Sequence, residues 1–296
     1  MNDCSNLQGL WLPLITPFLD GQVDEASLRI LIRYYSQKGF CGIILAATTG
    51  EGQTLSDDET KSIVDICRDE ISKENSNLNL YLGLSGTDPV RVSVRISQFN
   101  AWPIDGYLIS GPNYVRPTQA GVYDYFAVSA KSTKKPVIIY NIPYRTGVNI
   151  ENETMVELAS IPNVVGVKDC CSNPEQSYDL IRRAPDGFSV FTGEDGFFYN
   201  AFVHGAPGAI VTGSHVLVDY HLSIFENLAN GNQPAALELW NKVVHIPALL
   251  FAEPSPAPLK YWLWRQGLIS SPEVRSPMMP IRDQLEKRID MALAQQ

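Results

Sequence analysis

The chain has 296 residues, with a hydrophobic fraction of 45% and a charged fraction of 19%, which excludes an intrinsically disordered protein. Its length suits either about two average domains or one α/β barrel. Asp and Glu outnumber Lys and Arg by 32 to 23, giving a formal net charge of −9. Because no basic cluster offsets this charge, we expect no nucleic-acid partner.

Eight short apolar segments recur along the chain, and most are nearly continuous hydrophobic runs. Strands that are buried on both faces of a parallel sheet have this pattern. The predicted strands are Leu10–Thr16, Gly42–Ala46, Leu78–Leu84, Gly106–Ile109, Pro136–Tyr140, Val164–Lys168, Ser189–Phe191 and Gly208–Val211.

Amphipathic segments separate these strands and predict helices. The clearest helices are Glu25–Gln37, Asp57–Lys73 and Pro174–Arg183, and the residues that suit helix N-caps are Asp24, Ser56 and Thr118. Eight strand–helix units of roughly 28 residues fit βαβ crossovers. A doubly wound sheet has the same alternation, but the count of eight favours a (β/α)₈ TIM barrel with a C-terminal helical extension. We assign the barrel to residues 1–218, and the last barrel helix and the extension to 219–296.

Cysteines and histidines give no sign of a metal or hydrolase site. The five cysteines form no C-x-x-C pair, so we expect reduced thiols and no metal ion. The four histidines lack the spacing of a zinc protease or a catalytic triad. The N-terminus lacks the features of a signal peptide, and no apolar run reaches 18 residues. We therefore expect a soluble, cytoplasmic protein without a membrane partner.

The second predicted strand is followed by a turn that contains Thr48 and Thr49. Two hydroxyls and the free N–H groups of a glycine-bearing turn, which runs to Gly52, suit a carboxylate or a phosphate. The same letters also suit an ordinary turn with a helix cap. No phosphate-binding loop or dinucleotide motif follows any strand.

Two further strands end in residues that can carry chemistry. Tyr140 could donate and accept protons, and Arg145 could bind a carboxylate, although both also suit a plain loop. Lys168 directly follows an apolar strand; it is either the first solvated residue of a loop or a desolvated amine able to form a Schiff base. Lys260, in the helical tail, is the only rival lysine in an apolar setting. Tyr114 lies in a loop that is an ordinary connection unless its side chain points at a site.

Together these segments resemble the dihydrodipicolinate synthase / N-acetylneuraminate lyase family of pyruvate-dependent class I aldolases. The resemblance covers essentially the whole chain, because five motifs occur in the family's order. These are Pro17-Phe18, Thr48-Thr49-Gly50-Glu51, Tyr140-Asn141-Ile142-Pro143, Gly166-Val167-Lys168 and Glu253-Pro254-Ser255-Pro256-Ala257-Pro258-Leu259-Lys260. The family fold is a (β/α)₈ barrel with a helical extension, which agrees with the pattern of strands and helices.

The resemblance implies a role for each matching residue. Lys168 would form an imine with pyruvate, Tyr140 would act as the acid/base, and Thr48 would be its hydrogen-bond relay partner. Tyr114 would cross from a neighbouring subunit to complete the relay, so that the chain would be a homo-oligomer, a tetramer built as a dimer of dimers. The Schiff base on Lys168 implies that no separate cofactor is needed. Residues that would bind substrate are Thr49, Arg145, Gly193 and Ile210.

Arg145 also indicates the branch of the family, since an arginine at this place is typical of enzymes that hold the carboxylate of aspartate semialdehyde. The resemblance therefore implies the condensation of pyruvate with L-aspartate 4-semialdehyde, in diaminopimelate and lysine biosynthesis. The alternative is a lyase acting on a sugar acid, such as N-acetylneuraminate or a 2-keto-3-deoxy acid, which leaves Arg145 without a function. A non-catalytic barrel would need neither Arg145 nor Lys168.

The chain departs from the family pattern at several positions. Ala47 stands where glycine is usual, and Asn113 replaces an aromatic residue before the relay tyrosine. Asp57 and Thr60 replace histidines of lysine-inhibited relatives. The hypothesis that follows is weak or absent feedback by lysine, and inhibition by sub-millimolar lysine would refute it.

Overall fold

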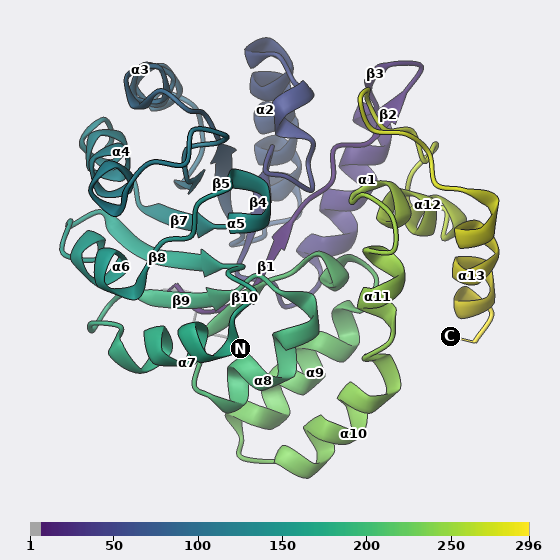
Figure 1. The fold of residues 1–296 in the computed structure, drawn as a ribbon. Helices are drawn as coiled ribbons and strands as arrows, with labels where there is room; N and C mark the ends of the chain where they lie inside the picture. Colours follow the sequence, from purple (N-terminus) through teal and green to yellow (C-terminus); the bar gives the residue numbers. More distant parts are fainter. Residues whose placement is uncertain (1–6, 296) are drawn as a thin grey trace. The chain divides into compact units, whose positions relative to one another are not determined.

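A computed structural model describes residues 7–295, and its eight parallel strands form a closed barrel in the order β1-β10-β9-β8-β7-β6-β5-β4 (Figure 1). The strands are β1 (Gly9–Pro13), β4 (Gly42–Leu45), β5 (Asn79–Leu84), β6 (Gly106–Ser110), β7 (Val137–Asn141), β8 (Val164–Asp169), β9 (Ser189–Thr192) and β10 (Gly208–Ile210). Helices separate the strands along the chain, which confirms the predicted TIM barrel.

The first strand is shorter than its apolar run predicts. It ends at Pro13, although Leu14, Ile15 and Thr16 are also buried. The Leu14 N–H donates to the Ile44 carbonyl over 2.9 Å, and the Thr16 hydroxyl donates to the Gly50 carbonyl over 2.8 Å. Burial therefore continues past the strand end, because the Leu14 N–H still bonds to β4 and the Thr16 hydroxyl bonds to the turn that follows β4.

The chain divides into two compact units, of which the first comprises the chain up to Trp11 together with Asn79–Val211. Its helices are α3 (Pro89–Phe99), α4 (Gln119–Lys131), α5 (Pro143–Thr146), α6 (Asn152–Leu158), α7 (Pro174–Arg183) and α8 (Phe198–Val203), with the 3₁₀ turn η2 (Asp195–Phe197). Helices α3, α4, α6 and α7 lie outside the strands of this unit (Figure 1). In its core, the Trp11 ring meets the edges of Tyr81 and Phe191 at centroid distances of 4.8 and 6.2 Å.

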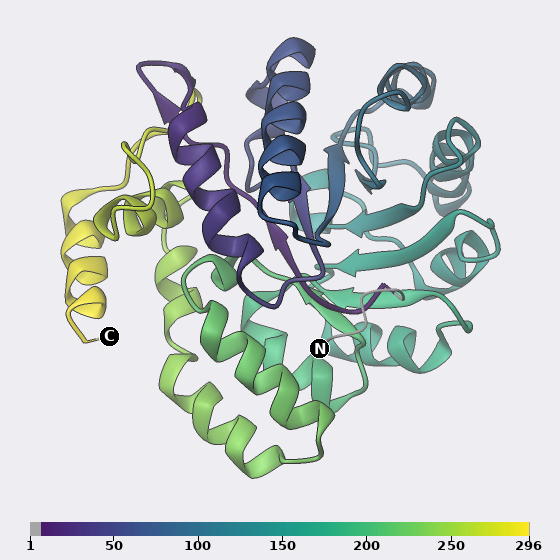
Figure 2. The same ribbon diagram turned by 180° about the vertical axis from the view of Figure 1, so that it is seen from behind.

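The second unit comprises Leu12–Leu78 and the chain from Thr212 onward. Its helices are α1 (Glu25–Ser36), α2 (Asp57–Lys73), α9 (Val218–Ala229), α10 (Gln233–Val243), α11 (Ile246–Leu250), α12 (Ala257–Arg265) and α13 (Asp283–Leu293), with the 3₁₀ turns η1 (Gly52–Thr54) and η3 (Thr212–His215). Helices α1 and α2 lie side by side, as do α9 and α10 (Figure 2). The boundary that the sequence predicts at residue 218 stays a prediction.

All three predicted N-caps are confirmed. The Asp24 side chain accepts from the Ser27 N–H, and the Thr118 side chain accepts from the Gly121 N–H. Ser56 forms a full capping box with Glu59. These caps satisfy N–H groups that a helix cannot pair internally, so they fix where each helix begins.

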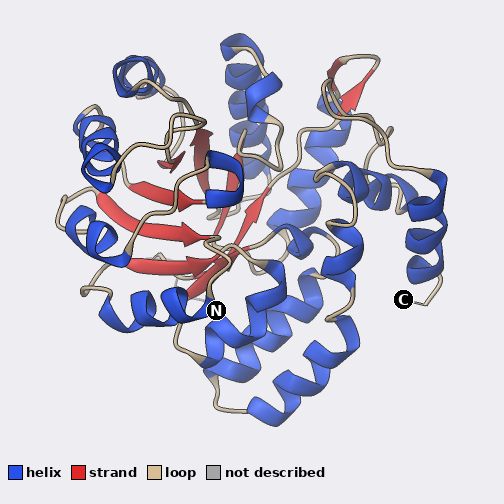
Figure 3. Ribbon diagram, viewed as in Figure 1, coloured by secondary structure: helices blue, strands red, loops and turns tan. Residues whose placement is uncertain are grey.

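The second unit also contains a small hairpin that the apolar pattern does not predict, β2 (Phe18–Leu19) paired antiparallel with β3 (Gln22–Val23) (Figure 3). Its turn is Asp20-Gly21, and both residues have positive φ angles, of 52° and 78°. An Asp-Gly pair of this kind is a strong hairpin signal, so a search for turn dipeptides would have found it. The tail holds this turn, because the Gly21 N–H donates to Glu273 over 2.8 Å.

The expectation of reduced thiols is wrong for one cysteine. Cys67, Cys170 and Cys171 are free, whereas Cys41 is disulfide-bonded. Nothing in its local sequence marks Cys41 as different from the others. Among residues 7–295, no helix is both long and apolar enough to cross a membrane.

Candidate functional site

Lys168 lies at the end of β8, where it is only 4% exposed. In the strand register it stands beside Tyr140 of β7, and its amino nitrogen is 4.4 Å from the centre of the Tyr140 ring. Burial lowers the pKa of the Lys168 amine, because the charged form loses its hydration. The sequence left open whether Lys168 is a solvated loop residue, and the structure excludes that.

The backbone beside Lys168 leaves no room for additional atoms. Gly193 follows β9, and a methyl group there would lie 2.8 Å from Cε of Lys168 and in collision with Sγ of Cys170. The Gly193 N–H donates to the Asp169 carbonyl over 2.8 Å, which fixes this close approach. Only glycine at position 193 therefore leaves room for the side chains of Lys168 and Cys170.

Three side chains around Lys168 were missed by sequence reasoning. Cys170 is buried and hydrogen-bonds with Tyr140, while the carboxylates of Asp195 and Glu194 act on the lysine electrostatically. Burial raises the pKa of the Cys170 thiol, so this thiol stays protonated. The signal that could have found Asp195 and Glu194 is their position directly after Gly193 at a strand end.

A second buried network lies one residue further along the same two strands. Asn141 and Asp169 stand beside each other in the register, and the Asn141 amide donates to Asp169 over 3.2 Å. The Ser177 hydroxyl donates to the same carboxylate, and Asn141 also donates to Asn149 over 3.0 Å. These bonds hold the ends of β7 and β8 together behind Tyr140 and Lys168.

Arg145 lies in the short helix α5 that follows β7. It is exposed, and its guanidinium carbon is 5.6 Å from the centre of the Tyr144 ring. In the described part of the chain it forms no ion pair with a carboxylate, so its two-nitrogen edge can bind one from solution.

Tyr114 lies in the loop between β6 and α4, with a side chain that is 92% exposed. Its φ angle of 72° is in the left-handed region, which bulky residues rarely adopt. The loop is nevertheless fixed, because the Tyr114 N–H donates to the Thr146 carbonyl over 3.1 Å and Thr87 donates to the Asn113 carbonyl over 3.0 Å. The loop is thus anchored by hydrogen bonds at both residues, while the Tyr114 ring is exposed.

In the second unit, the turn after β4 contains Thr48 and Thr49. Thr49 is buried and its hydroxyl lies 3.3 Å from that of Thr212, whereas Thr48 is half-buried. The turn closes through a bond of 3.1 Å from the Glu51 N–H to the Thr48 carbonyl. A methyl group at Gly50 would lie 2.9 Å from the Leu14 carbonyl oxygen, so this tight turn requires glycine.

Ile210 is fully buried at the end of β10, where it pairs with Trp11 of β1. His215 and His221, which follow in the second unit, are also buried. His215 accepts from the Ile15 N–H over 3.3 Å and His221 hydrogen-bonds with Ser214, so both are structural. Within the described chain, no group of His, Cys, Asp and Glu could hold a metal ion.

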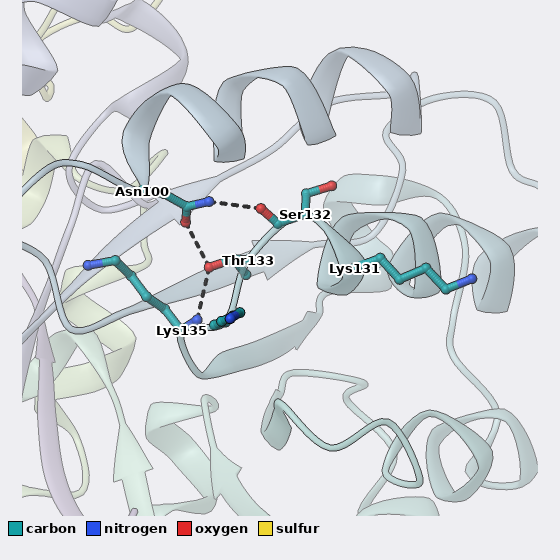
Figure 4. Close-up of a pocket in the computed structure, with 6 residues that line it drawn as sticks. Asn100, Lys131, Ser132, Thr133 and Lys135 are labelled. Atoms are coloured by element: carbon teal, nitrogen blue, oxygen red, sulfur yellow. Dashed lines mark hydrogen bonds between the residues drawn. The ribbon is translucent and has the colours of Figure 1, made fainter.

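A pocket of about 480 Å³ lies on the first unit, far from these strand ends. Its lining includes Asn100, Lys131, Thr133 and Lys135, and the Thr133 hydroxyl links Asn100 to the Lys135 N–H (Figure 4). These residues precede β7, so the pocket is at the amino end of the strand that carries Tyr140 at its other end. Barrel enzymes place their chemistry at the carboxyl ends, and we therefore do not assign the reaction to this pocket.

Comparisons with known proteins agree with this geometry. The model of the dihydrodipicolinate synthetase family matches residues 6–296. A curated 4-hydroxy-tetrahydrodipicolinate synthase 2 of Clostridium acetobutylicum is 40% identical over 287 residues, which is 97% of this chain and 99% of that protein.

Solved structures of dihydrodipicolinate synthases are also similar. The chloride-inhibited enzyme of Acinetobacter baumannii in complex with pyruvate has a TM-score of 0.92 and 29% identity, covering 98% of each chain. The enzyme of Cyanidioschyzon merolae with lysine bound has a TM-score of 0.92 and 26% identity, again covering 98% of each chain.

Proposed function

Since the chain belongs to the dihydrodipicolinate synthetase family, we propose that it condenses pyruvate with L-aspartate 4-semialdehyde, the reaction of a 4-hydroxy-tetrahydrodipicolinate synthase. The observation that carries this proposal is the buried Lys168, whose amine lies against Tyr140 at a strand end. Because burial lowers its pKa, more of this amine is neutral, and the neutral form is the one that attacks a ketone.

The proposed reaction forms one carbon–carbon bond. The Lys168 amine adds to the ketone carbon of pyruvate, and the ketone oxygen takes up protons and leaves as water, which gives an iminium. The iminium withdraws electrons, so the methyl group loses a proton and becomes a nucleophilic enamine. The enamine carbon then attacks the aldehyde carbon of the second substrate, whose oxygen takes up a proton. The amino group of that substrate adds to the iminium carbon and displaces the Lys168 amine, which closes the ring and frees the lysine. The iminium is the electron sink, and the reaction needs no separate cofactor.

Tyr140 is the proposed acid/base for these proton transfers. Its ring lies 4.4 Å from the Lys168 nitrogen, so its hydroxyl belongs to the same site. A positioned hydroxyl that both donates and accepts suits this task. Thr48 is the proposed relay partner of Tyr140, and Tyr114 of a neighbouring subunit completes the relay.

The carboxylates of the two substrates would have separate binding groups. Thr49 binds the pyruvate carboxylate through its hydroxyl and N–H, in the tight turn after β4. Arg145, whose guanidinium is free of ion pairs in the described chain, binds the carboxylate of the semialdehyde. Gly193 and Ile210 line the space for pyruvate beside Lys168 with their backbone.

We further propose that the protein is a cytoplasmic homo-oligomer, a tetramer built as a dimer of dimers. The supporting observation is Tyr114, because a loop anchored by hydrogen bonds holds its aromatic ring almost fully exposed. A second subunit would cover this ring and bring it to the relay.

The test is turnover of pyruvate and aspartate semialdehyde, measured through an excess of an NADPH-dependent reductase that consumes the product. We expect turnover that Lys168→Ala abolishes and that Lys131→Ala, which removes an exposed lysine, leaves unchanged. In parallel, borohydride should reduce the pyruvate imine and add mass to Lys168. Imine formation without turnover of the semialdehyde would favour a sugar acid as the second substrate. A label on Lys260 would show that Lys168 is not the nucleophile.

A further inference from the structure

A buried ion pair joins the turn after β4 to the helical tail. The Lys260 side chain is 0% exposed and the Glu51 side chain 2%, and the Lys260 amine donates to the Glu51 carboxylate. Lys260 is on α12, 209 positions along the chain from Glu51. Buried charges are expensive unless they are paired, so each group depends on the other.

The remaining bonds of the pair also come from the tail. The Arg275 N–H donates to the second Glu51 oxygen over 2.9 Å, and the Lys260 amine donates to the Glu273 carbonyl over 2.8 Å. The Lys260 nitrogen lies 4.2 Å from the centre of the Phe18 ring. Both carboxylate oxygens of Glu51 are therefore bound by groups of the tail.

The Arg275 side chain extends this attachment. Its guanidinium pairs with Glu59 of α2 and donates to the Thr54 carbonyl over 3.1 Å. It also donates to the Gly21 carbonyl over 2.8 Å. The tail thus binds the chain on both sides of Glu51, including the start of the helix that follows.

Glu51 transmits this restraint to Thr49 through the backbone. Its φ angle is 51°, a left-handed value that is unfavourable for glutamate and persists only where the surroundings impose it. The Glu51 N–H closes the turn onto the Thr48 carbonyl, and the Thr16 hydroxyl holds the Gly50 carbonyl. The two residues after Thr49 are therefore both held in place, and the Thr49 hydroxyl itself lies 3.3 Å from that of Thr212.

From these contacts we propose that Lys260 and Glu51 are positioning residues, which hold the Thr49 turn in the geometry that binds the substrate carboxylate. The inference rests on the proposed function, in which that carboxylate belongs to pyruvate. It assigns Lys260 a structural charge instead of the nucleophilic role for which the sequence made it a rival of Lys168.

The test compares Lys260→Met, Glu51→Gln and the double variant, with Arg265→Met as a control that removes a tail ion pair remote from the turn. The readout is the pyruvate concentration for half-maximal borohydride labelling of Lys168, together with the melting temperature. We expect this concentration to rise at least tenfold in the single variants, with full labelling at saturation and the KM for the semialdehyde unchanged. Arg265→Met should behave as the wild type.

The double variant separates positioning from stability, because removing both charges leaves no unpaired buried ion. We expect its melting temperature to recover while its pyruvate requirement stays high. The inference would be overturned if the double variant recovered both the wild-type melting temperature and the wild-type pyruvate requirement. It would also be overturned if the single variants folded and were labelled at the same pyruvate concentration as the wild type. Wild-type protein that pyruvate does not label at all would instead refute the proposed function, and the inference would be overturned with it.

Discussion

Replacing Gly193 with alanine tests whether the close packing of Gly193 against Lys168 matters for the reaction. The added methyl carbon would lie 2.8 Å from Cε of Lys168, whereas ordinary contacts begin at 3.4 Å. The lysine must therefore retreat by about 0.6 Å, and Cys170 by more. Displacements of about 1 Å at a reacting group can cost about 100-fold in rate.

We expect Gly193→Ala to lower kcat by about 10- to 100-fold, with about 1–3 kcal/mol of lost stability from overpacking. Gly196→Ala is the matched control, because it lies three positions away and a methyl group there would meet no atom within 4 Å. The assay is the coupled turnover, together with the rate of borohydride labelling of Lys168. Wild-type rates in Gly193→Ala, or equal losses in Gly196→Ala, would refute the reasoning.

Three further predictions concern other parts of the chain. Burial lowers the pKa of His215 to about 4, so only the unfolded state binds this proton between pH 6.5 and 4. Buried His221, whose pKa is lowered to about 3, contributes a similar loss of unfolding free energy on acidification. In urea unfolding, the loss on acidification should therefore be about 3 kcal/mol smaller in His215→Gln than in the wild type, and an equal loss would contradict the role of His215. Arg145→Ala should raise the KM for the semialdehyde at least tenfold without changing the labelling of Lys168 by pyruvate, and a changed labelling would contradict its assignment to the second substrate. We expect the Tyr114→Ala and Lys168→Ala variants to be inactive alone. If each site takes Tyr114 from a neighbouring subunit, dissociating the two variants and reassembling them together should restore part of the turnover, because mixed oligomers contain sites with both residues. No recovery would argue against the shared relay.

The strands could be predicted because each is buried on both faces, which leaves a run of apolar letters. The same signal fails where burial continues past the strand end, as at Leu14 and Ile15: the Leu14 N–H still bonds to β4, whereas the Ile15 N–H bonds to the His215 ring and not to a strand. It also fails for the hairpin at Asp20 and Gly21, where the signal is in the turn. The apolar pattern indicates which residues are buried, but burial alone does not determine whether the backbone forms a strand.

The candidate site was predictable only in part, for a different reason. Lys168 and Tyr140 could be predicted because they lie at the carboxyl ends of strands, where the active sites of TIM barrels are found. Lys260 is also buried, but it lies in the helical tail, away from any strand end, so the sequence already favours Lys168; what the sequence does not show is that Glu51 neutralises Lys260. The pairing depends on a contact between distant positions, which neither spacing nor composition records.

That contact also has a consequence for synthesis of the protein on the ribosome. A nascent chain that has just completed β10 contains all eight strands, yet it lacks Lys260 of α12, which pairs with the Glu51 carboxylate, and the Arg275 N–H that binds its second oxygen. A carboxylate without its partner would be drawn toward water, away from the buried position it takes in the finished protein. The turn proposed to bind the substrate carboxylate is thus among the first segments to be translated, but it gains its buried partners only when the tail has been made.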